Sequence, residues 1–502
     1  MQPQSLFRFD NSFARDLEGL YVPFRPAEVR APRLLFLNQP LAEELGLDAA
    51  ALRTGQGAAI FAGNTVPEGA HPLAQAYAGH QFGGFSPQLG DGRALLLGEI
   101  LDRQGRRRDI AFKGSGRTPF SRGGDGKAAV GPMLREVLIG EAMHALGIPT
   151  TRALAVAATG EQVVREQLLP GAVLTRVAAS HLRVGTFQFY AARRDMDKLR
   201  RLADYAIARH DPDLADAPDR YLALLGRVVQ RQARLIAQWM NVGFIHGVMN
   251  TDNMTISGET IDYGPCAFME AYDPKAVFSS IDQGGRYAYG NQPLIAQWNL
   301  ARLAEALLPL MVTDDSDASA QQAVARATEV LVSFDSQYDA ALLRGQRAKL
   351  GLDDTGAADG DDATLADDWL DLLESHQVDF TLGWRRLADA AAGDEPVLHA
   401  VFPDAKRLTE WLARWKQRCA SEAAVTPEMR AQRMRRASPW IIPRNHRVEE
   451  ALQAASDDDD LAPFDKLLAA LRDPYAEKPE HLAYAQPAPA AVTATYQTFC
   501  GT

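Results

Sequence analysis

The 502-residue sequence has little cysteine, no long apolar run and no surplus of positive charge. Three cysteines, at 266, 419 and 500, are too few for a disulfide framework in a chain of this length. No segment is long and apolar enough to cross a bilayer, and residues 1–20 carry too many charges for a signal peptide. We therefore expect a protein of the reducing cytoplasm that has no membrane partner.

The charge balance narrows the classes of partner further. Lys and Arg number 53 against 64 Asp and Glu, which gives a formal net charge of −11 at pH 7. Broad binding of nucleic acid depends on a basic surface, so we expect no nucleic-acid partner. Hydrophobic residues at 46% and charged residues at 23% are ordinary globular values, and the length exceeds one ordinary core. The chain is expected to fold as two lobes with appended helices, or as two to three domains.

Residues 89–178 are rich in short β-like runs around one helical pattern. The helix is predicted at 131–146, and strands are predicted at 93–100, 108–115, 151–158 and 161–169. An antiparallel sheet that carries one long helix is the plan of a protein-kinase N-lobe. Beyond about residue 180 the apolar period becomes helical, with helices predicted at 222–242, before Gly243, and at 298–311.

We therefore predict an α+β, protein-kinase-like, two-lobed fold. Its expected parts are an N-terminal extension (1–80), a β-rich N-lobe with one long helix (81–178), a helical C-lobe with a metal-binding loop (179–345) and a helical C-terminal region with a flexible, cysteine-containing tail (346–502). Two short strands, MTIS (254–257) and TIDY (260–263), are expected to flank a turn, and the acidic stretch 351–367 is expected to be a loop.

A lysine and a glutamate are spaced as kinases place them. Lys113 lies in a predicted strand, where alternation sets Ile110 and Phe112 on the opposite face, and Glu136 follows 23 residues later in the predicted helix. A strand lysine that pairs with a helix glutamate and contacts the phosphates is how kinases hold ATP. Each residue taken alone is more often an ordinary surface charge.

The segment HGVMNTDN (246–253), followed by Asp262 in DYG, carries a sharper signal. Kinases have H-R-D-x-x-x-x-N and then D-F-G, because the asparagine and the second aspartate converge on the metal. His246, Asn253 and Asp262 match that template, but Val248 stands where kinases keep the catalytic aspartate. Valine cannot accept a proton, so the chain cannot work as a kinase in the usual way.

Asp252 is the remaining carboxylate of that loop. If the chain is an enzyme, Asp252 is the candidate general base. The alternative is that its side chain caps a turn, as Asx residues often do. We expect His246 to be structural, bonding backbone across the loop.

Two glycine-rich segments and two arginines have open interpretations. QLGDGR (88–93) and SGRTPFSRGGDG (115–126) could each cradle phosphates through backbone amides or form plain hairpin turns. Arg176 and Arg183 are seven residues apart, so on a helix they would point the same way. Two arginines in register suit either a polyphosphate or surface salt bridges.

Longer motifs point to a known family. YAGHQFGGFSPQLGDGRA (77–94), FKGSGRTPFSRGGDGKA (112–128), HGVMNTDNM (246–254) and the ending YQTFCGT together resemble the selenoprotein O family of pseudokinase-fold proteins, over nearly the whole chain. Some members carry selenocysteine in that ending, where this sequence has Cys500.

The resemblance implies protein adenylylation. AMP would move from ATP, or UMP from UTP, to Ser, Thr or Tyr hydroxyls of protein substrates, with release of pyrophosphate and with the nucleotide flipped relative to a kinase. Carried over by position, the nucleotide contacts fall on Gly90, Gly92, Arg93, Lys113, Asp125, Gly126, Arg176, Arg183 and Asp262. The metal ligands, for Mg²⁺ or Mn²⁺, fall on Asn253 and Asp262, the proton acceptor on Asp252 and the partner of Lys113 on Glu136.

Two further hypotheses stay open beside adenylyl transfer. One is phosphoryl transfer by an atypical kinase, although Val248 argues against it. The other is a non-catalytic pseudokinase that binds nucleotide as a scaffold. A disulfide between Cys266 and Cys500 is a separate hypothesis, against the simpler view of a buried and an exposed thiol.

Overall fold

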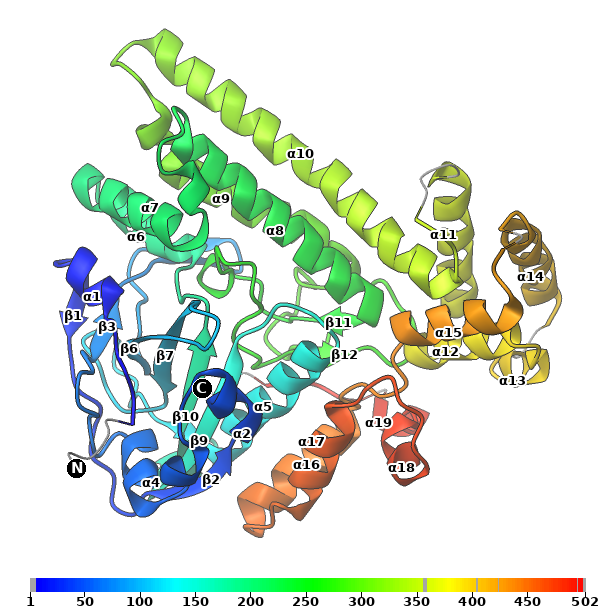
Figure 1. The fold of residues 1–502 in the computed structure, drawn as a ribbon, viewed down its shortest axis with the longest axis horizontal. Coiled ribbons are helices and arrows are strands. Elements are labelled where there is room, and N and C mark those ends of the chain that lie inside the picture. The colour runs from blue at the N-terminus through cyan, green and yellow to red at the C-terminus, as the bar shows by residue number, and fades with distance from the viewer. Residues whose placement is uncertain (1–5, 355–358, 403–404, 423, 494, 500–502) are drawn as a thin grey trace.

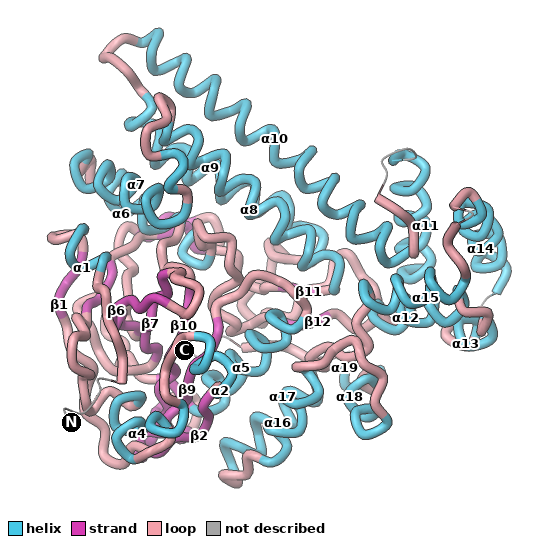
Figure 2. The backbone as a smooth tube through the Cα atoms, in the orientation of Figure 1, coloured by secondary structure: helices cyan, strands magenta, loops and turns pink. Residues whose placement is uncertain are grey.

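The computed structural model describes residues 6–354, 359–402, 405–422, 424–493 and 495–499. It shows an α+β fold, with one main sheet toward the N-terminal side and helices over the rest of the chain, as Figures 1 and 2 show. Among the described residues, none of the helices is both long enough and apolar enough to span a membrane.

The main sheet has eight strands, and every pairing in it is antiparallel. Its order is β1 (Tyr21–Pro23), β3 (Leu73–Gln75), β6 (Ala94–Leu101), β7 (Arg107–Lys113), β10 (Leu168–Ala178), β9 (Arg152–Val164) and β2 (Arg33–Leu37), with β8 (Ala128–Ala129) beside β10. A separate hairpin joins β4 (Gly79–Gln81) to β5 (Gly84–Ser86), and a short pair joins β11 (Phe244–Ile245) to β12 (Ala267–Phe268).

Each face of the sheet is covered by different helices. Ile110 and Phe112 lie in a core with α2 (Gln39–Glu44), α3 (Ala49–Leu52) and α4 (Gly55–Phe61). Ala111, between them, faces the core that contains α5 (Val130–Ala145). The predicted alternation along this strand is therefore confirmed, and it turns Lys113 toward the face that α5 covers.

The second strand pair departs from the sequence prediction. The runs 151–158 and 161–169, expected as two strands, form one long strand, β9, and its partner β10 begins only at Leu168. The chain stays extended past Gly160 because the ladder accommodates an irregularity there, with a register shift between Pro170 and Ala172.

The helical half forms along the predicted patterns. α8 (Arg220–Val242) ends at Gly243, whose φ of 71° is the left-handed conformation that glycine adopts at helix ends. α9 (Gln292–Met311) and the long α10 (Asp317–Leu350) pack beside α8, and the three run together across Figure 1. The shorter helices α6 (Val184–Ala192) and α7 (Met196–His210) lie between them and the sheet, and α1 (Ser12–Asp16) packs on β6.

Two local predictions are wrong. MTIS and TIDY do not form strands; the segment makes only isolated bridges, Thr255 with Arg183 and Thr260 with Thr150, because its backbone is bound by other elements. The stretch 351–367 is not all loop either, since α11 (Asp359–Ser375) begins within it.

The C-terminal region divides into two groups of helices. α11, α12 (Phe380–Ala391), α13 (Glu395–His399), α14 (Ala405–Ala420) and α15 (Pro427–Ala437) cluster at the far end of α10 in Figure 1. Four buried tryptophans fill the core of this cluster: Trp369, Trp384, Trp411 and Trp415. α16 (Asn445–Asp457) and α17 (Ala462–Leu471) instead pack against α5, and α18 (Leu482–Ala485) and α19 (Ala490–Thr493) follow.

Candidate functional site

A cavity of about 460 Å³ opens between the sheet and the loop 248–265. This volume lies in the range that small-molecule sites occupy. Eleven of the twelve site residues predicted from the sequence line it: Gly90, Gly92, Arg93, Lys113, Asp125, Gly126, Arg176, Arg183, Asp252, Asn253 and Asp262. The twelfth, Glu136, lies directly behind Lys113.

Lys113 bridges two carboxylates at the back of the cavity. It is the last residue of β7, and its ammonium group contacts Glu136 of α5 and donates to Asp262 Oδ1 at 2.6 Å. The side chains of Lys113 and Glu136 are only 7% and 4% exposed. Two buried carboxylates on the same ammonium group fix the position of the lysine, because moving it would separate buried opposite charges.

The two arginines converge on the same aspartate from different elements. Arg176 lies on β10 and donates to Asp262 Oδ1 at 2.7 Å, whereas Arg183 precedes α6 and lies 3.7 Å from Oδ2. The two arginines therefore do not share a helix. They meet because β10 leads directly through a short loop into α6. Arg183 also donates to the backbone oxygen of Asp252 at 3.0 Å and lies over the ring of Tyr77.

Asp262 is the centre of this charge cluster. Burial alone would raise its pKa, but Lys113, Arg176 and Arg183 outweigh that effect and hold the pKa well below its usual value. Its backbone φ is 63°, a left-handed conformation that non-glycine residues adopt rarely and that often marks functional positions. The side chain is thus held ionised at the cavity wall.

Asp252 has a contrasting environment. Gln81 donates to its Oδ2 at 3.2 Å, while Oδ1 is buried without a hydrogen-bond partner among the described residues. Burial raises the pKa of Asp252 to about 6, against the opposing pull of Arg183. The pKa values of Asp252 and Asp262 are therefore shifted in opposite directions, a pattern typical of acid–base sites.

The neighbours of Asp252 in its loop are positioned by backbone contacts. Asn253 donates from its amide nitrogen to the Val248 oxygen at 3.0 Å, so its amide oxygen remains as an acceptor. His246 is fully buried and its Nε2 lies 2.9 Å from the oxygen of Ile261, which agrees with the structural role expected for it. Val248 faces the cavity with an apolar side chain.

The two glycine-rich segments form one combined wall. Thr118 donates to the Asp91 oxygen at 2.6 Å, and the Ser121 hydroxyl donates to the Gly92 oxygen, so the second loop folds over the first. Gly126 has a φ of 69°, and a Cβ there would lie 2.2 Å from the Gly116 oxygen. Only glycine fits this point, where the two ends of the second segment approach each other.

Asp125 makes a contact that the sequence did not suggest. Both of its carboxylate oxygens accept from Arg165, at 2.9 and 3.1 Å. Arg165 lies in the turn between β9 and β10 and also lines the cavity. A charged residue in a hairpin turn carries no sequence signal of its own, so this pairing could be found only from the fold.

Three other residues of the site were not singled out from the sequence: Tyr77, Gln81 and Asp91. They lie within the motif 77–94, whose unusual length was the available signal. Asp91 accepts from the backbone N–H of Gln75 at 2.8 Å, and burial raises its pKa to about 6. Its position under the 90–93 turn fixes that turn against β3.

The cavity is cationic although the chain is acidic. Seven Lys or Arg side chains line it against three carboxylates; the cations are Arg93, Lys113, Arg122, Lys127, Arg165, Arg176 and Arg183. A basic cavity with glycine-rich walls suits an anion that carries several negative charges. Cys266 lies near this wall but is fully buried, and burial raises the pKa of its thiol to about 11; Cys500 is outside the described residues.

Comparison with known proteins shows the family to which the chain belongs. The profile of the family described as "Protein adenylyltransferase SelO" matches residues 4–472, and the chain belongs to this family. The resemblance drawn from the motifs is therefore confirmed.

Relatives match over their full length. A protein of Cereibacter sphaeroides, named "Protein nucleotidyltransferase YdiU", is 64% identical over 497 residues, which cover 99% of this chain and 100% of the relative. Proteins with the same name from Chromobacterium violaceum and Methylorubrum extorquens are 62% and 56% identical. They cover 96% and 99% of this chain, and 99% and 100% of the respective relatives.

Proposed function

We propose that this protein transfers AMP from ATP to the hydroxyl group of a Ser, Thr or Tyr side chain of another protein, and releases pyrophosphate. Membership in the SelO family supports the reaction type. The observation that carries the proposal is the presence of both Val248 and Asp252 in the same loop. An apolar side chain stands where a kinase keeps its base, and a buried carboxylate with an unpartnered oxygen lies four residues further on.

The cationic residues account for the binding of a triphosphate. Lys113 is fixed by Glu136, and Arg176 and Arg183 are fixed by Asp262, so their charges are in place before a ligand arrives. Positioned cations stabilise the charge that develops on phosphate oxygens during transfer, without a cost of reorganisation. The backbone amides of the 90–93 and 123–126 turns would add neutral donors on the opposite wall.

Asp252 is proposed to take the proton from the attacking hydroxyl. A carboxylate of raised basicity, close to the reacting group, is an effective acceptor near neutral pH. Gln81 orients Oδ2, and Oδ1 has no hydrogen-bond partner in the part of the chain that the structure describes. The hydroxyl oxygen would then attack the α-phosphorus, and the bond from that phosphorus to the bridging oxygen of pyrophosphate would break.

A divalent cation fits the donors present. The described residues contain no group of three or more His, Cys, Asp or Glu side chains that could form a metal site by themselves. The amide oxygen of Asn253 and the ionised carboxylate of Asp262 are hard oxygen donors at one wall of the cavity, which suits Mg²⁺ or Mn²⁺ completed by phosphate oxygens and water. When bound, such an ion would neutralise phosphate charge.

The arrangement also supports a protein-kinase-like core. A strand lysine paired to a helix glutamate, and an asparagine and an aspartate on the facing loop, are the elements that kinases use around ATP. In this proposal the same elements serve a nucleotide that presents its α-phosphate, not its γ-phosphate, to the base. UTP as an alternative donor would use the same phosphate contacts.

Radiolabelled ATP tests the proposal. The protein is incubated with a cell lysate, Mg²⁺ or Mn²⁺, and ATP labelled at the α or at the γ phosphate, and label on protein is measured. We expect label from the α position only, and none with Asp262→Ala. Label from γ alone would replace the proposal with an atypical kinase, and tight ATP binding without any label would favour a scaffold.

A further inference from the structure

Arg176 contacts the cavity with one end of its guanidinium and a buried histidine with the other. Its Nη1 donates to Asp262 Oδ1 at 2.7 Å, and its Nε donates to His181 Nε2 at 3.3 Å. Arg176 and His181 are only 2% and 4% exposed. No described residue accepts a hydrogen bond from Nη2, which leaves that donor for a ligand in the cavity.

The hydrogen bonds of His181 define its tautomer. Its Nδ1 and its backbone N–H both lie 2.9 Å from Asp109 Oδ2. A carboxylate only accepts, so Nδ1 carries the proton and Nε2 is left as the acceptor that Arg176 requires. Burial lowers the pKa of His181, and the nearby Arg176 and Arg183 act in the same direction against Asp109, which keeps the ring neutral.

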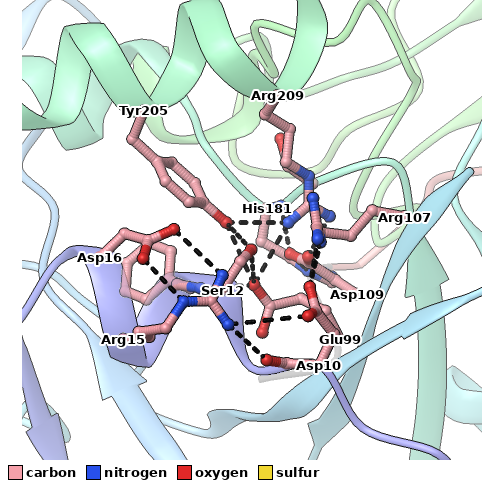
Figure 3. Close-up of polar contacts among 12 residues, drawn as sticks. Asp10, Ser12, Arg15, Asp16, Glu99, Arg107, Asp109, His181, Tyr205 and Arg209 are labelled. Atoms are coloured by element: carbon pink, nitrogen blue, oxygen red, sulfur yellow. Dashed lines mark hydrogen bonds and ion pairs between the residues drawn. The ribbon is translucent and has the colours of Figure 1, made fainter.

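Asp109 is held in turn by Arg209 of α7. Arg209 Nη2 donates to Asp109 Oδ1 at 2.5 Å, and its Nη1 lies 3.3 Å from Glu99 Oε1. Figure 3 shows these side chains facing one another between α7 and the sheet. Burial alone would raise the pKa of Asp109, but Arg209 and His181 outweigh it and lower the pKa to about 2. The carboxylate therefore stays an acceptor at working pH.

The network ends on the N-terminal helix α1. Glu99 Oε1 accepts from the Ser12 hydroxyl at 2.8 Å and from the Phe13 backbone at 2.6 Å, and Tyr205 donates to the same oxygen at 3.1 Å. Figure 3 shows Ser12, Tyr205 and Glu99 side by side. A continuous line of hydrogen bonds thus runs from the N-terminal segment to a cavity arginine. Each member has a partner on both sides, so the line has few alternative arrangements.

We propose that His181 is a positioning residue that acts through Arg176. It holds the Arg176 guanidinium so that Nη2 points at the nucleotide phosphates. The inference rests on the proposed function only for the identity of the ligand. An unrestrained arginine has several rotamers, and one fixed at Nε and Nη1 has lost that freedom before the ligand binds. Asp109 and Arg209 keep His181 in the tautomer that makes this restraint.

Two substitutions at His181 separate the hydrogen bonds it makes. The amide nitrogen of His181→Asn lies near the Nδ1 position and keeps a donor to Asp109, but it loses the acceptor for Arg176. The longer side chain of His181→Gln places an amide oxygen near the Nε2 position and restores that acceptor. Loss of one hydrogen bond to a charged group predicts a roughly tenfold to hundredfold lower kcat/KM for His181→Asn. His181→Gln should recover most of it.

A double-mutant cycle distinguishes positioning from a general structural role. If His181 acts through Arg176, adding His181→Asn to Arg176→Ala should change kcat/KM by less than about threefold. The matched control is His210→Asn, which truncates a nearby histidine that contacts Ser180 and not the arginine. It should leave kcat/KM unchanged. Thermal unfolding of every variant checks that the fold is retained.

The same double-mutant cycle can be measured without turnover, as the Kd of each variant for a non-hydrolysable ATP analogue in calorimetry. If the wild type binds the analogue but transfers nothing, the proposed function fails and the cycle in Kd still decides the role of His181. The inference would be overturned if His181→Asn weakened kcat/KM and Kd by the same factor in the wild type and in Arg176→Ala. A His181→Gln variant that is as impaired as His181→Asn while it remains folded would also overturn it.

Discussion

Replacing Asp252 with asparagine separates the chemistry of the site from its structure. The two side chains have the same shape, and Gln81 can still donate to the amide oxygen where it now donates to Oδ2. Asparagine cannot accept the proton of an attacking hydroxyl. General-base catalysis contributes about 10²- to 10⁴-fold to rate, so we expect kcat for AMP transfer to fall by that amount.

Unlike kcat, the stability of Asp252→Asn and its affinity for ATP should not fall. Asp252 is only 8% exposed, and burial raises its pKa to about 6, which means that the folded protein holds the charged form at a cost. A neutral amide removes this cost, so Asp252→Asn should be at least as stable as the wild type. Loss of a negative charge beside the phosphates should leave the Kd for ATP unchanged or lower it.

The assay combines single-turnover transfer with calorimetric titration of ATP on the same preparations. Glu259→Gln is the matched control, because it neutralises another buried carboxylate of raised pKa that lies outside the cavity. It should keep the wild-type kcat. If Asp252→Asn retains kcat within about threefold, Asp252 is not the base and the reasoning from Val248 and Asp252 is wrong.

Substitutions of Lys113, Arg444 and Glu259 test three other charged side chains. Lys113→Ala removes a buried cation that contacts both Glu136 and Asp262, so the Kd for ATP should rise by at least about tenfold in calorimetric titration, and an unchanged Kd would contradict the role given to Lys113. Arg444→Leu removes the partner that lies 2.6 Å from both Glu270 and Asp379, and denaturant unfolding should show a loss of about 3–5 kcal/mol; a loss under about 1 kcal/mol would show that the two carboxylates are relieved in another way. Burial raises the pKa of Glu259 to about 7 from 4.5, so the stability that its neutral form provides is complete below pH 4.5 and is lost as pH rises through 7. Relative to Glu259→Gln, the wild-type free energy of unfolding should therefore fall by up to about 3 kcal/mol across that window, and parallel pH profiles would refute the shift.

Local signals predicted the elements that carry their own pattern. Gly243 ends α8 because a left-handed residue closes a helix, and alternation around Lys113 gave the face on which it lies. These features depend on neighbours in sequence. The pattern of lysine, glutamate, asparagine and aspartate could be proposed for the same reason, since each residue sits in a recognisable segment.

Features that depend on tertiary contacts were not predicted. The MTIS segment is extended and apolar in part, but its backbone pairs with Arg183 and not with TIDY. The contact between Asp125 and Arg165, which lies in another hairpin, was not predicted either. His181 carries no motif at all. Its role comes from Asp109 and Arg176, which lie on two adjacent strands, and no spacing along the chain reveals that arrangement.

The mass of the group attached to a target protein directly tests whether AMP, and not phosphate, is transferred. A target protein labelled in the lysate experiment is purified, modified with ATP, digested and analysed by mass spectrometry. The account predicts an added adenylyl group on a Ser, Thr or Tyr side chain, with pyrophosphate as the second product. An added phosphoryl group, with ADP as the second product, would contradict it.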